Sequence, residues 1–203
     1  MQLHRHDVVA KATQLLDDYG IADLTMRRLA RELSVSPGAL YWHFADKQEL
    51  LGAVADRILL PVPAGVDDPS WARRVVALGT ALRDALLSST DGAELVSASF
   101  AAGKSVRMTE ILAQLTDAAA EGGIDPSHAD LAARTVLYYV LGFTADEQSR
   151  LQWDAAGALA DGQSVLTANP NARFGFGLKL LVDGIAAHTN VEVDVESSVG
   201  HLD

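Results

Sequence analysis

The side chains best suited to recognition chemistry gather in residues 24–51. Three arginines lie in the first part of this segment, at Arg27, Arg28 and Arg31. Tyrosine, tryptophan, histidine and lysine donors follow a short link, at Tyr41, Trp42, His43 and Lys47. Guanidinium, hydroxyl and ammonium groups bind phosphates and the edges of bases, so the segment is a candidate nucleic-acid interface.

The apolar spacing predicts that two short helices carry these donors. Met26, Leu29, Ala30 and Leu33 recur on one helical face, and Thr25 is placed to cap that helix. A three-residue link leads to Pro37, which suits the first turn of a second helix running to about residue 43. Two such helices form a helix-turn-helix, whose second helix fits a major groove about 12 Å wide.

The start of the second helix is made of small residues, at Ser36, Pro37, Gly38 and Ala39. Small side chains let a helix N-terminus approach DNA closely, and its free N–H groups favour phosphate. Apolar positions predict a further helix on each side of the pair. The first ends at Gly20, and Asp46 caps the other with Glu49 completing a capping box.

A cluster of prolines and glycine marks one joint in the chain, at Pro61, Pro63, Gly65 and Pro69. We therefore expect a helix-turn-helix domain over residues 1–60 and a second helical domain over residues 61–203. The expected helices beyond the joint span roughly residues 71–86, part of 91–103, 108–119, a long stretch from Asp125 and Pro126 to about 150, a weaker 152–160 and finally 172–188. Residues 161–171 should form a loop, and the acidic tail from Thr189 should fray. Strand-type alternation occurs only weakly in that tail, so the fold class is all-α.

Composition bounds the class of protein. The chain has 203 residues, 49% of them hydrophobic and none of them cysteine, which predicts a folded protein without disulfides. No apolar signal segment follows the N-terminus, and the apolar-rich run 131–145 is interrupted by Arg134 and falls short of the ~20 residues of a membrane span. The sequence therefore favours a cytoplasmic protein that has no membrane partner.

The net charge of −11 is unusual for a protein that binds DNA, but it is unevenly distributed. Residues 1–60 hold seven Lys and Arg against eight Asp and Glu, whereas residues 61–203 hold nine against nineteen. The first sixty residues can still place their cations on one face. An acidic remainder would suppress non-specific adhesion to nucleic acid.

A structural interpretation competes with DNA binding, because helical hairpins with aromatic clusters are usually core and arginine runs are usually solvated. The residue string itself decides between the two. Residues 24–51 resemble the DNA-binding domain of the tetracycline-repressor (TetR) family. The shared pattern consists of Leu24-Thr25, Leu29-Ala30, Leu33-Ser34-Val35-Ser36, Leu40-Tyr41-Trp42-His43-Phe44, Lys47 and Leu50-Leu51. The Tyr41-Trp42-His43 triplet resembles the residues at this position in the branch of the family that contains the tetracycline repressor itself.

The resemblance implies roles by position. Arg27, Pro37, Gly38 and Ala39 would face bases, while Thr25, Ser36, Tyr41, His43 and Lys47 would contact phosphates. Trp42 would either join the DNA contacts or pack inside the chain. Many relatives have glycine where this chain has Ser34; a left-handed serine there would strain the turn by on the order of 1–2 kcal/mol.

The C-terminal half resembles the ligand-binding and dimerisation domain of the same branch, through Asp91-Gly92-Ala93, residues 138–148 and residues 176–184. The family implies a homodimeric regulator, most often a repressor, that a small molecule releases from its operator. The predicted helices at 127–150 and 172–188 are apolar on more than one face, which a dimeric four-helix bundle would cover. Complete burial within one subunit is the alternative.

The family also implies a ligand cavity within the second domain. We expect an apolar lining with Arg107 or Asp146 as a polar anchor; the remaining candidates are Phe100, Met108, Leu112, Tyr139, Phe143 and Trp153. In the tetracycline repressor a histidine shortly after the Asp-Gly-Ala motif binds magnesium. That place falls at Val96, which has no lone pair, so we expect an organic ligand without a metal or other cofactor.

Other sites are weak. Gly103-Lys104-Ser105 lacks the earlier glycine of a phosphate-binding loop, Gly175-Phe176-Gly177 lacks its third glycine, and Asp146 and Glu147 point apart on a helix. No nucleophile–base pair stands out, so we expect no enzymatic activity. An enzyme with a helical cavity and a ligand-sequestering protein with a vestigial DNA head remain as alternatives, the second disfavoured by Arg27 and Lys47.

Overall fold

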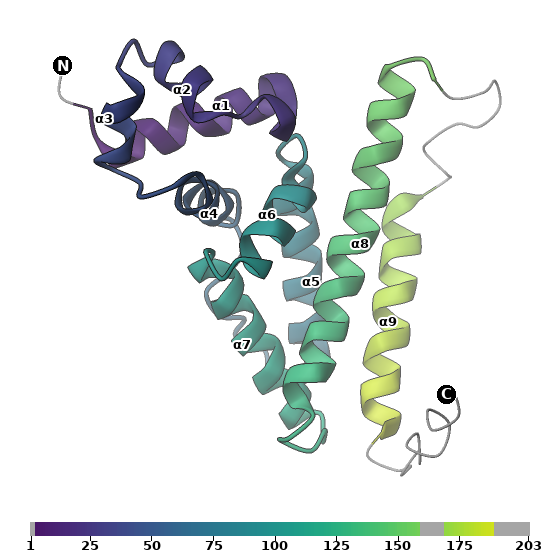
Figure 1. Cartoon of the computed structure of the whole chain (residues 1–203). Coiled ribbons are helices and arrows are strands. Elements are labelled where there is room, and N and C mark those ends of the chain that lie inside the picture. The colour runs from purple at the N-terminus through teal and green to yellow at the C-terminus, as the bar shows by residue number, and fades with distance from the viewer. Residues whose placement is uncertain (1–2, 159–168, 189–203) are drawn as a thin grey trace, which may run out of the picture.

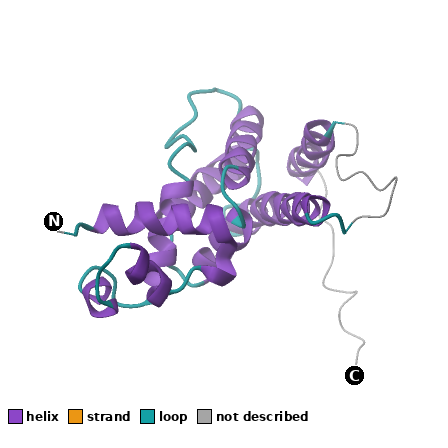
Figure 2. Ribbon diagram, turned by 90° about the horizontal axis from the view of Figure 1, so that it is seen from above, coloured by secondary structure: helices purple, strands orange, loops and turns teal. Residues whose placement is uncertain are grey.

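The computed structural model describes residues 3–158 and 169–188, and every regular element in these two ranges is a helix (Figure 2). The all-α prediction is confirmed. Figure 1 shows the helices of residues 5–58, here called the head, on one side of the molecule. The long helices α8 (Ala129–Ala155) and α9 (Pro170–His188) lie side by side on the other, with the helices of residues 71–121 between them.

The head contains α1 (Arg5–Asp23), α2 (Met26–Glu32), α3 (Pro37–Tyr41) and α4 (Lys47–Ile58). Two helix starts are capped as the sequence predicts. The Thr25 hydroxyl accepts from the Arg28 N–H at 3.2 Å, and the Asp46 carboxylate accepts from the Glu49 N–H at 2.7 Å. The Glu49 carboxylate bonds to the Ala45 N–H at 2.7 Å, one residue upstream of the partner expected in a capping box.

Three details of the head bear on the prediction. Gly20 ends the regular part of α1 with φ 76°, as predicted, and a short helical turn follows it to Asp23. Helix α3 ends at Tyr41, two residues early. Ser34 is left-handed with φ 56°, as expected for the turn, so the chain holds a strain of about 1–2 kcal/mol there.

The remaining helices are α5 (Trp71–Leu87), α6 (Gly92–Ala101), α7 (Val106–Glu121), α8 (Ala129–Ala155) and α9 (Pro170–His188). Helix α5 packs against α6, α7, α8 and α9, and its buried face is lined by Val75, Leu78, Leu82 and Leu86. The linker between α4 and α5 contains the predicted joint. The division at residue 60 stays a prediction.

Three predicted helices in this half differ in extent from the structure. The long helix begins at Ala129 rather than Asp125, because the Asp125 carboxylate accepts from the Ser127 N–H at 2.8 Å and forms a turn. Within the described residues, no separate helix begins after residue 152, because α8 has no glycine or proline to stop it between residue 143 and its end at Ala155. Residues 159 and 160 of the predicted helix lie outside the described residues. The last helix begins at Pro170, two residues early. Most of the expected loop, at 161–168, and the tail from 189 lie outside the described residues.

The core of the head explains how the short helices are held. Leu24, Leu29, Leu40, Phe44 and Leu50 are buried between the four helices. Burial of each such side chain contributes about 1.5–3 kcal/mol. A helix of five residues such as α3 has little stability of its own, so packing against α2 and the burial of Leu40 fix its position.

Candidate nucleic-acid interface

The turn between α2 and α3 is built by backbone hydrogen bonds. The Ser34 N–H donates to the Arg31 carbonyl at 3.1 Å, and the Val35 N–H donates to the Ala30 carbonyl at 3.0 Å. Leu29 and Leu40 are fully buried where the two helices pack together. The helix-turn-helix geometry therefore follows from the left-handed Ser34 and from the apolar faces of both helices.

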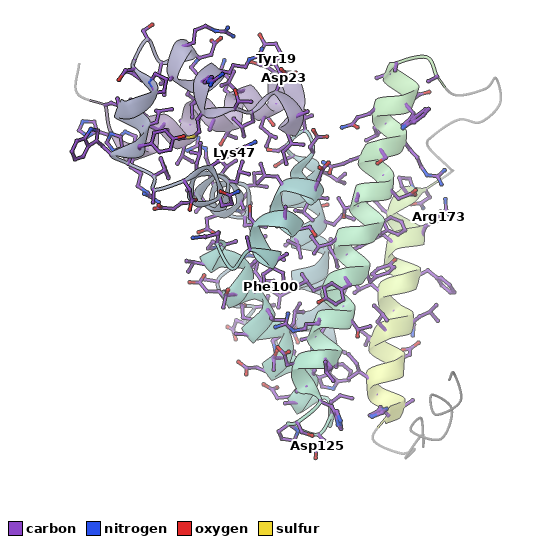
Figure 3. The ribbon with its side chains drawn as sticks, viewed as in Figure 1. Tyr19, Asp23, Lys47, Phe100, Asp125 and Arg173 are labelled. Carbon is purple, nitrogen blue, oxygen red and sulfur yellow. The ribbon has the colours of Figure 1, made fainter. Side chains whose placement is uncertain are left out.

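The arginines of α2 separate into two kinds. Arg28 is a structural cation, because its guanidinium pairs with Asp23 at 2.7 Å and stacks over the Tyr19 ring at 3.7 Å. Figure 3 shows Tyr19 and Asp23 together at the end of α1, with Lys47 elsewhere on the head. The Arg27 side chain is exposed and forms no hydrogen bond or ion pair within the described ranges. It is therefore available to a partner.

The start of α3 is open to solvent. Ser36, Pro37 and Gly38 are exposed, and Ala39 is half-buried. The Ser36 side chain makes no capping hydrogen bond. A Cβ added to Gly38 would meet nothing nearer than the Ser36 hydroxyl at 3.8 Å, so the chain's own packing does not require glycine there. A small residue at this position leaves space for a partner to come close to the start of α3.

The aromatic residues that follow are also turned outward. Trp42 is 90% exposed, so the interpretation that it packs inside the chain is wrong. Tyr41 is exposed as well, while His43 is half-buried. Thr25 is exposed at the start of α2, and Lys47 lies half-buried at the start of α4. The structure thus brings the sequence-predicted residues to the ends of three consecutive helices in the head.

Arg5 is a residue that the sequence reasoning missed. Its guanidinium donates to the His43 carbonyl, pairs with the Glu49 carboxylate at 3.0 Å and lies 4.1 Å over the Phe44 ring. The Ala45 N–H and Arg5 lower the pKa of Glu49. Arg5 therefore ties the end of α3 to α1 and α4. A contact between residues 38 positions apart leaves no periodic signal in the sequence.

The candidate ligand-pocket residues are distributed over several environments. Met108 and Leu112 are buried on α7. Tyr139 and Phe143 form an aromatic cluster with Phe174, with ring centroids 5.4–5.7 Å apart. Phe100 is half-buried, and the Arg134 guanidinium lies 5.7 Å from its ring centroid (labelled in Figure 3).

The remaining candidates face other surroundings. Arg107 donates to the Val62 carbonyl in the linker at 2.6 Å. Asp146 is exposed and pairs with Arg150 at 2.8 Å, and Trp153 is exposed at the end of α8. A shared ligand site for all of these residues stays a prediction.

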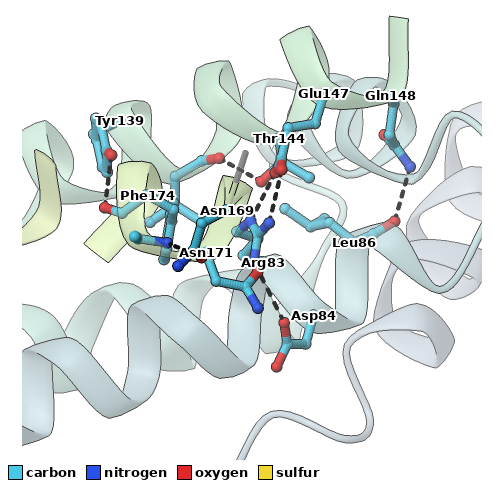
Figure 4. Close-up of polar contacts among 12 residues, drawn as sticks. Arg83, Asp84, Leu86, Tyr139, Thr144, Glu147, Gln148, Asn169, Asn171 and Phe174 are labelled. Atoms are coloured by element: carbon cyan, nitrogen blue, oxygen red, sulfur yellow. Dashed lines mark hydrogen bonds and ion pairs between the residues drawn. The ribbon is translucent and has the colours of Figure 1, made fainter. Parts of the chain in front are cut away.

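A buried charge cluster in the second half was also missed (Figure 4). Arg83 on α5 is 4% exposed and donates twice to the Glu147 carboxylate of α8, at 2.7 Å each. It also donates to the Asn171 side chain at 3.0 Å and lies 5.0 Å over the Phe174 ring. The bonds to Glu147 raise the pKa of Arg83, and burial raises the pKa of Tyr139.

This cluster joins α5, α8 and α9, because Asn171 and Phe174 belong to α9 and the Tyr139 hydroxyl donates to the Phe174 carbonyl at 2.8 Å. The sequence did hold a signal for it. Arg83 falls on the apolar face of its helix beside Leu82 and Leu86, where a charge needs a buried partner.

Two family models match the chain. Residues 8–54 match the bacterial regulatory proteins of the tetR family, and residues 63–166 match the tetracyclin repressor-like C-terminal domain. The chain belongs to the tetR family. Tetracycline repressor protein class A of Escherichia coli is 31% identical over 96% of this chain and 96% of its own length.

Solved structures agree with this assignment. The crystal structure of Mycobacterium smegmatis BioQ is 64% identical, with a TM-score of 0.85 over 92% of this chain and 99% of that chain. BioQ with its natural double-stranded DNA operator is 61% identical, with a TM-score of 0.81 over 92% and 100%. A TetR variant from Acinetobacter baumannii AYE in complex with minocycline is 30% identical, with a TM-score of 0.75 over 94% and 100%.

Membership of the tetR family fixes the class of function. The chain is a DNA-binding transcription regulator and not an enzyme, which sets aside the enzymatic alternative. The candidate interface lies within the matched residues 8–54. In the two described ranges, no helix is long and apolar enough to cross a membrane.

Proposed function

We propose that the chain is a cytoplasmic repressor that binds a DNA operator as a homodimer and that a small organic ligand releases it. The observation that carries this proposal is the open donor face of α2 and α3 in a chain 61% identical to BioQ, whose structure contains its double-stranded operator. A helix-turn-helix dimer reads one half-site with each head.

The exposed residues support a division of roles at the interface. Arg27 and the small residues at the start of α3, Pro37, Gly38 and Ala39, face the bases. Phosphate contacts come from Thr25, Ser36, Tyr41, His43 and Lys47. Trp42 adds an aromatic contact to the DNA backbone, because its exposed ring has no packing role within the chain.

The second copy covers the outer face of α8 and α9. Phe176 is 66% exposed and Leu180 is 55% exposed on one face of α9, and Tyr138 is exposed on α8. The opposite faces of these helices are buried within the chain, through Leu137 and Leu178 among others. Large apolar side chains on a second helix face favour a four-helix bundle between two copies.

The ligand is organic and binds without magnesium. Tetracycline repressors are among the relatives, but the place of their metal-binding histidine falls at Val96, which is fully buried on α6. Apolar residues of α7 and α8, such as Met108 and Phe143, supply the lining.

The test is a selection of genomic DNA fragments by the full chain, followed by a screen of small molecules for release of the recovered duplex. The expected result is a two-fold symmetric motif and at least one metal-independent ligand that releases it. Recovery of fragments without a common motif would contradict operator binding. Release only by magnesium-dependent ligands would contradict the assignment of Val96.

A further inference from the structure

The head meets the rest of the chain through α4, which packs on α6 and α7, and through Asp91 at the start of α6. One carboxylate oxygen accepts from the Ile21 N–H of α1 at 2.8 Å. The other accepts from the side-chain amide of Gln152, on the last turns of α8. A single side chain therefore connects the DNA-binding head with the long helix that we assign to the dimer bundle.

The turn that carries Asp91 is itself fastened to α8. The Gln148 amide donates to the Leu86 carbonyl at 3.0 Å and to the Ser89 carbonyl at 2.8 Å (Figure 4 shows the bond to Leu86). Its oxygen accepts from the Ala93 N–H at 3.0 Å. Gln148 and Gln152 lie one helical turn apart on α8, so the helix holds both the turn and Asp91.

The head is shaped for this contact. Gly20 has φ 76°, and a Cβ added there would lie 2.8 Å from the Asp91 carboxylate oxygen, so any other residue would push Asp91 away. Thr90 adds a second bond beside it, because its hydroxyl donates to the Asp17 carbonyl at 3.0 Å. Asp91 itself is left-handed with φ 54°, a conformation that aspartate and asparagine tolerate better than other side chains.

The bridge has a donor on each side. The Ile21 N–H and the Gln152 amide both donate, and the Asp91 carboxylate offers an acceptor oxygen to each. Asparagine in place of Asp91 would keep both bonds, because the Gln152 amide can turn over and accept from the new amide. Methionine in place of Gln152 has no comparable donor, so Gln152→Met removes the bridge and leaves the bond from Ile21 to Asp91 in place.

We propose that Asp91 is a positioning residue for operator binding, which sets the angle of the DNA-binding head to α8 by bonding to Ile21 and Gln152. The inference rests on the proposed homodimer that reads two half-sites. Binding to one half-site needs one head, whereas binding to two needs both heads at a fixed separation. Asp91 therefore affects binding to two half-sites and not binding to one.

The test measures fluorescence anisotropy of the full chain on the selected duplex and on a duplex with one half-site. Gln152→Met should weaken binding to the two-half-site duplex at least tenfold and change binding to the single half-site less than twofold. Gln114→Met, the same change on α7 away from this contact, should affect neither. Equal losses on both duplexes, or no loss on either, would overturn the proposal.

A second variant separates positioning from a general loss of folding. Gln152→Glu alone places two carboxylates together and should weaken binding as Gln152→Met does. The double variant Asp91→Asn, Gln152→Glu keeps the net charge, and its asparagine amide can donate to the new carboxylate while its oxygen still accepts from Ile21. Recovery to within threefold of wild type is expected, and losses that simply add would contradict the bridge. A wild type that does not distinguish the two duplexes would instead refute the proposed function.

Discussion

The donor face of α2 and α3 and the outer face of α8 and α9 are both exposed in the single chain. The side chains of the first are polar or small, whereas those of the second are large and apolar. The first presents donors such as Arg27 and Lys47 beside small residues at the start of α3. The second presents Tyr138, Phe176 and Leu180. A polar exposed face suits reversible binding of a charged partner, whereas an apolar exposed face suits a permanent protein–protein interface. The two faces therefore point to DNA and to a second copy, respectively.

A charge on the apolar face should have the largest effect. Leu180→Glu would bury an unpaired carboxylate in each copy, at a cost of about 3 kcal/mol or more per copy. Leu181 is half-buried inside its own chain, so Leu180 tests the interface without disturbing the core. Sedimentation should show a monomer that has lost its operator affinity.

Leu60→Glu is the matched control, because Leu60 is 67% exposed in the linker and belongs to neither open face. It should leave the dimer intact. A dimer that survives Leu180→Glu would place the interface elsewhere on the chain.

The buried cluster between α5, α8 and α9 should be the next most sensitive position. Arg83→Met leaves the Glu147 carboxylate buried without its cation, which should lower the free energy of unfolding by about 3–5 kcal/mol. Arg150→Met breaks an exposed pair with Asp146 on the same helix and should cost about 0.5 kcal/mol or less. Urea unfolding of both variants measures the contrast, and equal losses would contradict the burial argument.

On the polar face, Arg27→Ala should cost roughly 1–3 kcal/mol of operator binding and relax the preference at one base position. Arg57→Ala provides the control, since Arg57 is exposed at the far end of α4. Anisotropy titrations with a set of single-base operator variants would measure both. A uniform loss across all the duplexes would assign Arg27 to the phosphates instead.

Lys47→Ala should have a smaller effect of a different kind. Loss of one phosphate contact weakens binding to every sequence alike and flattens the slope of log affinity against log salt by about 1. The slope is measured by repeating the titration at several salt concentrations. An unchanged slope would remove Lys47 from the interface.

The smallest expected effect concerns tetracycline. Calorimetry of the chain with tetracycline and magnesium should show no specific heat, because Val96 provides no metal ligand. The Escherichia coli class A repressor serves as the positive control. Magnesium-dependent binding in the micromolar range would mean that another residue takes the place of the missing histidine.

The two faces also differ in how far the sequence could predict them. Thr25, Ser34, Pro37 and Asp46 act on neighbouring residues as caps, a turn and a helix start, so local chemistry predicted the helix-turn-helix. An apolar helix face carries no such mark, since exposed Leu180 and buried Leu178 are the same residue type. Only the three-dimensional structure separates them.

Long-range polar contacts were the least predictable. Arg5 meets His43 and Asp91 meets Ile21 across 38 and 70 residues, and neither pair has a characteristic spacing. The start of α8 was placed too early because Asp125 and Pro126 resemble a helix start, whereas the Asp125 carboxylate closes a turn with Ser127. The sequence also does not separate ligand-binding residues from core residues, because pocket linings and cores are made of the same side chains.

The central claim is that the chain binds a specific operator as a dimer. The most direct measurement is an anisotropy titration of the full chain, at about 0.15 M salt, on the selected duplex and on a scrambled duplex of equal length and composition. We expect two chains per selected duplex and an affinity at least about a thousandfold higher than for the scrambled one. Equal affinities for the two duplexes would contradict it.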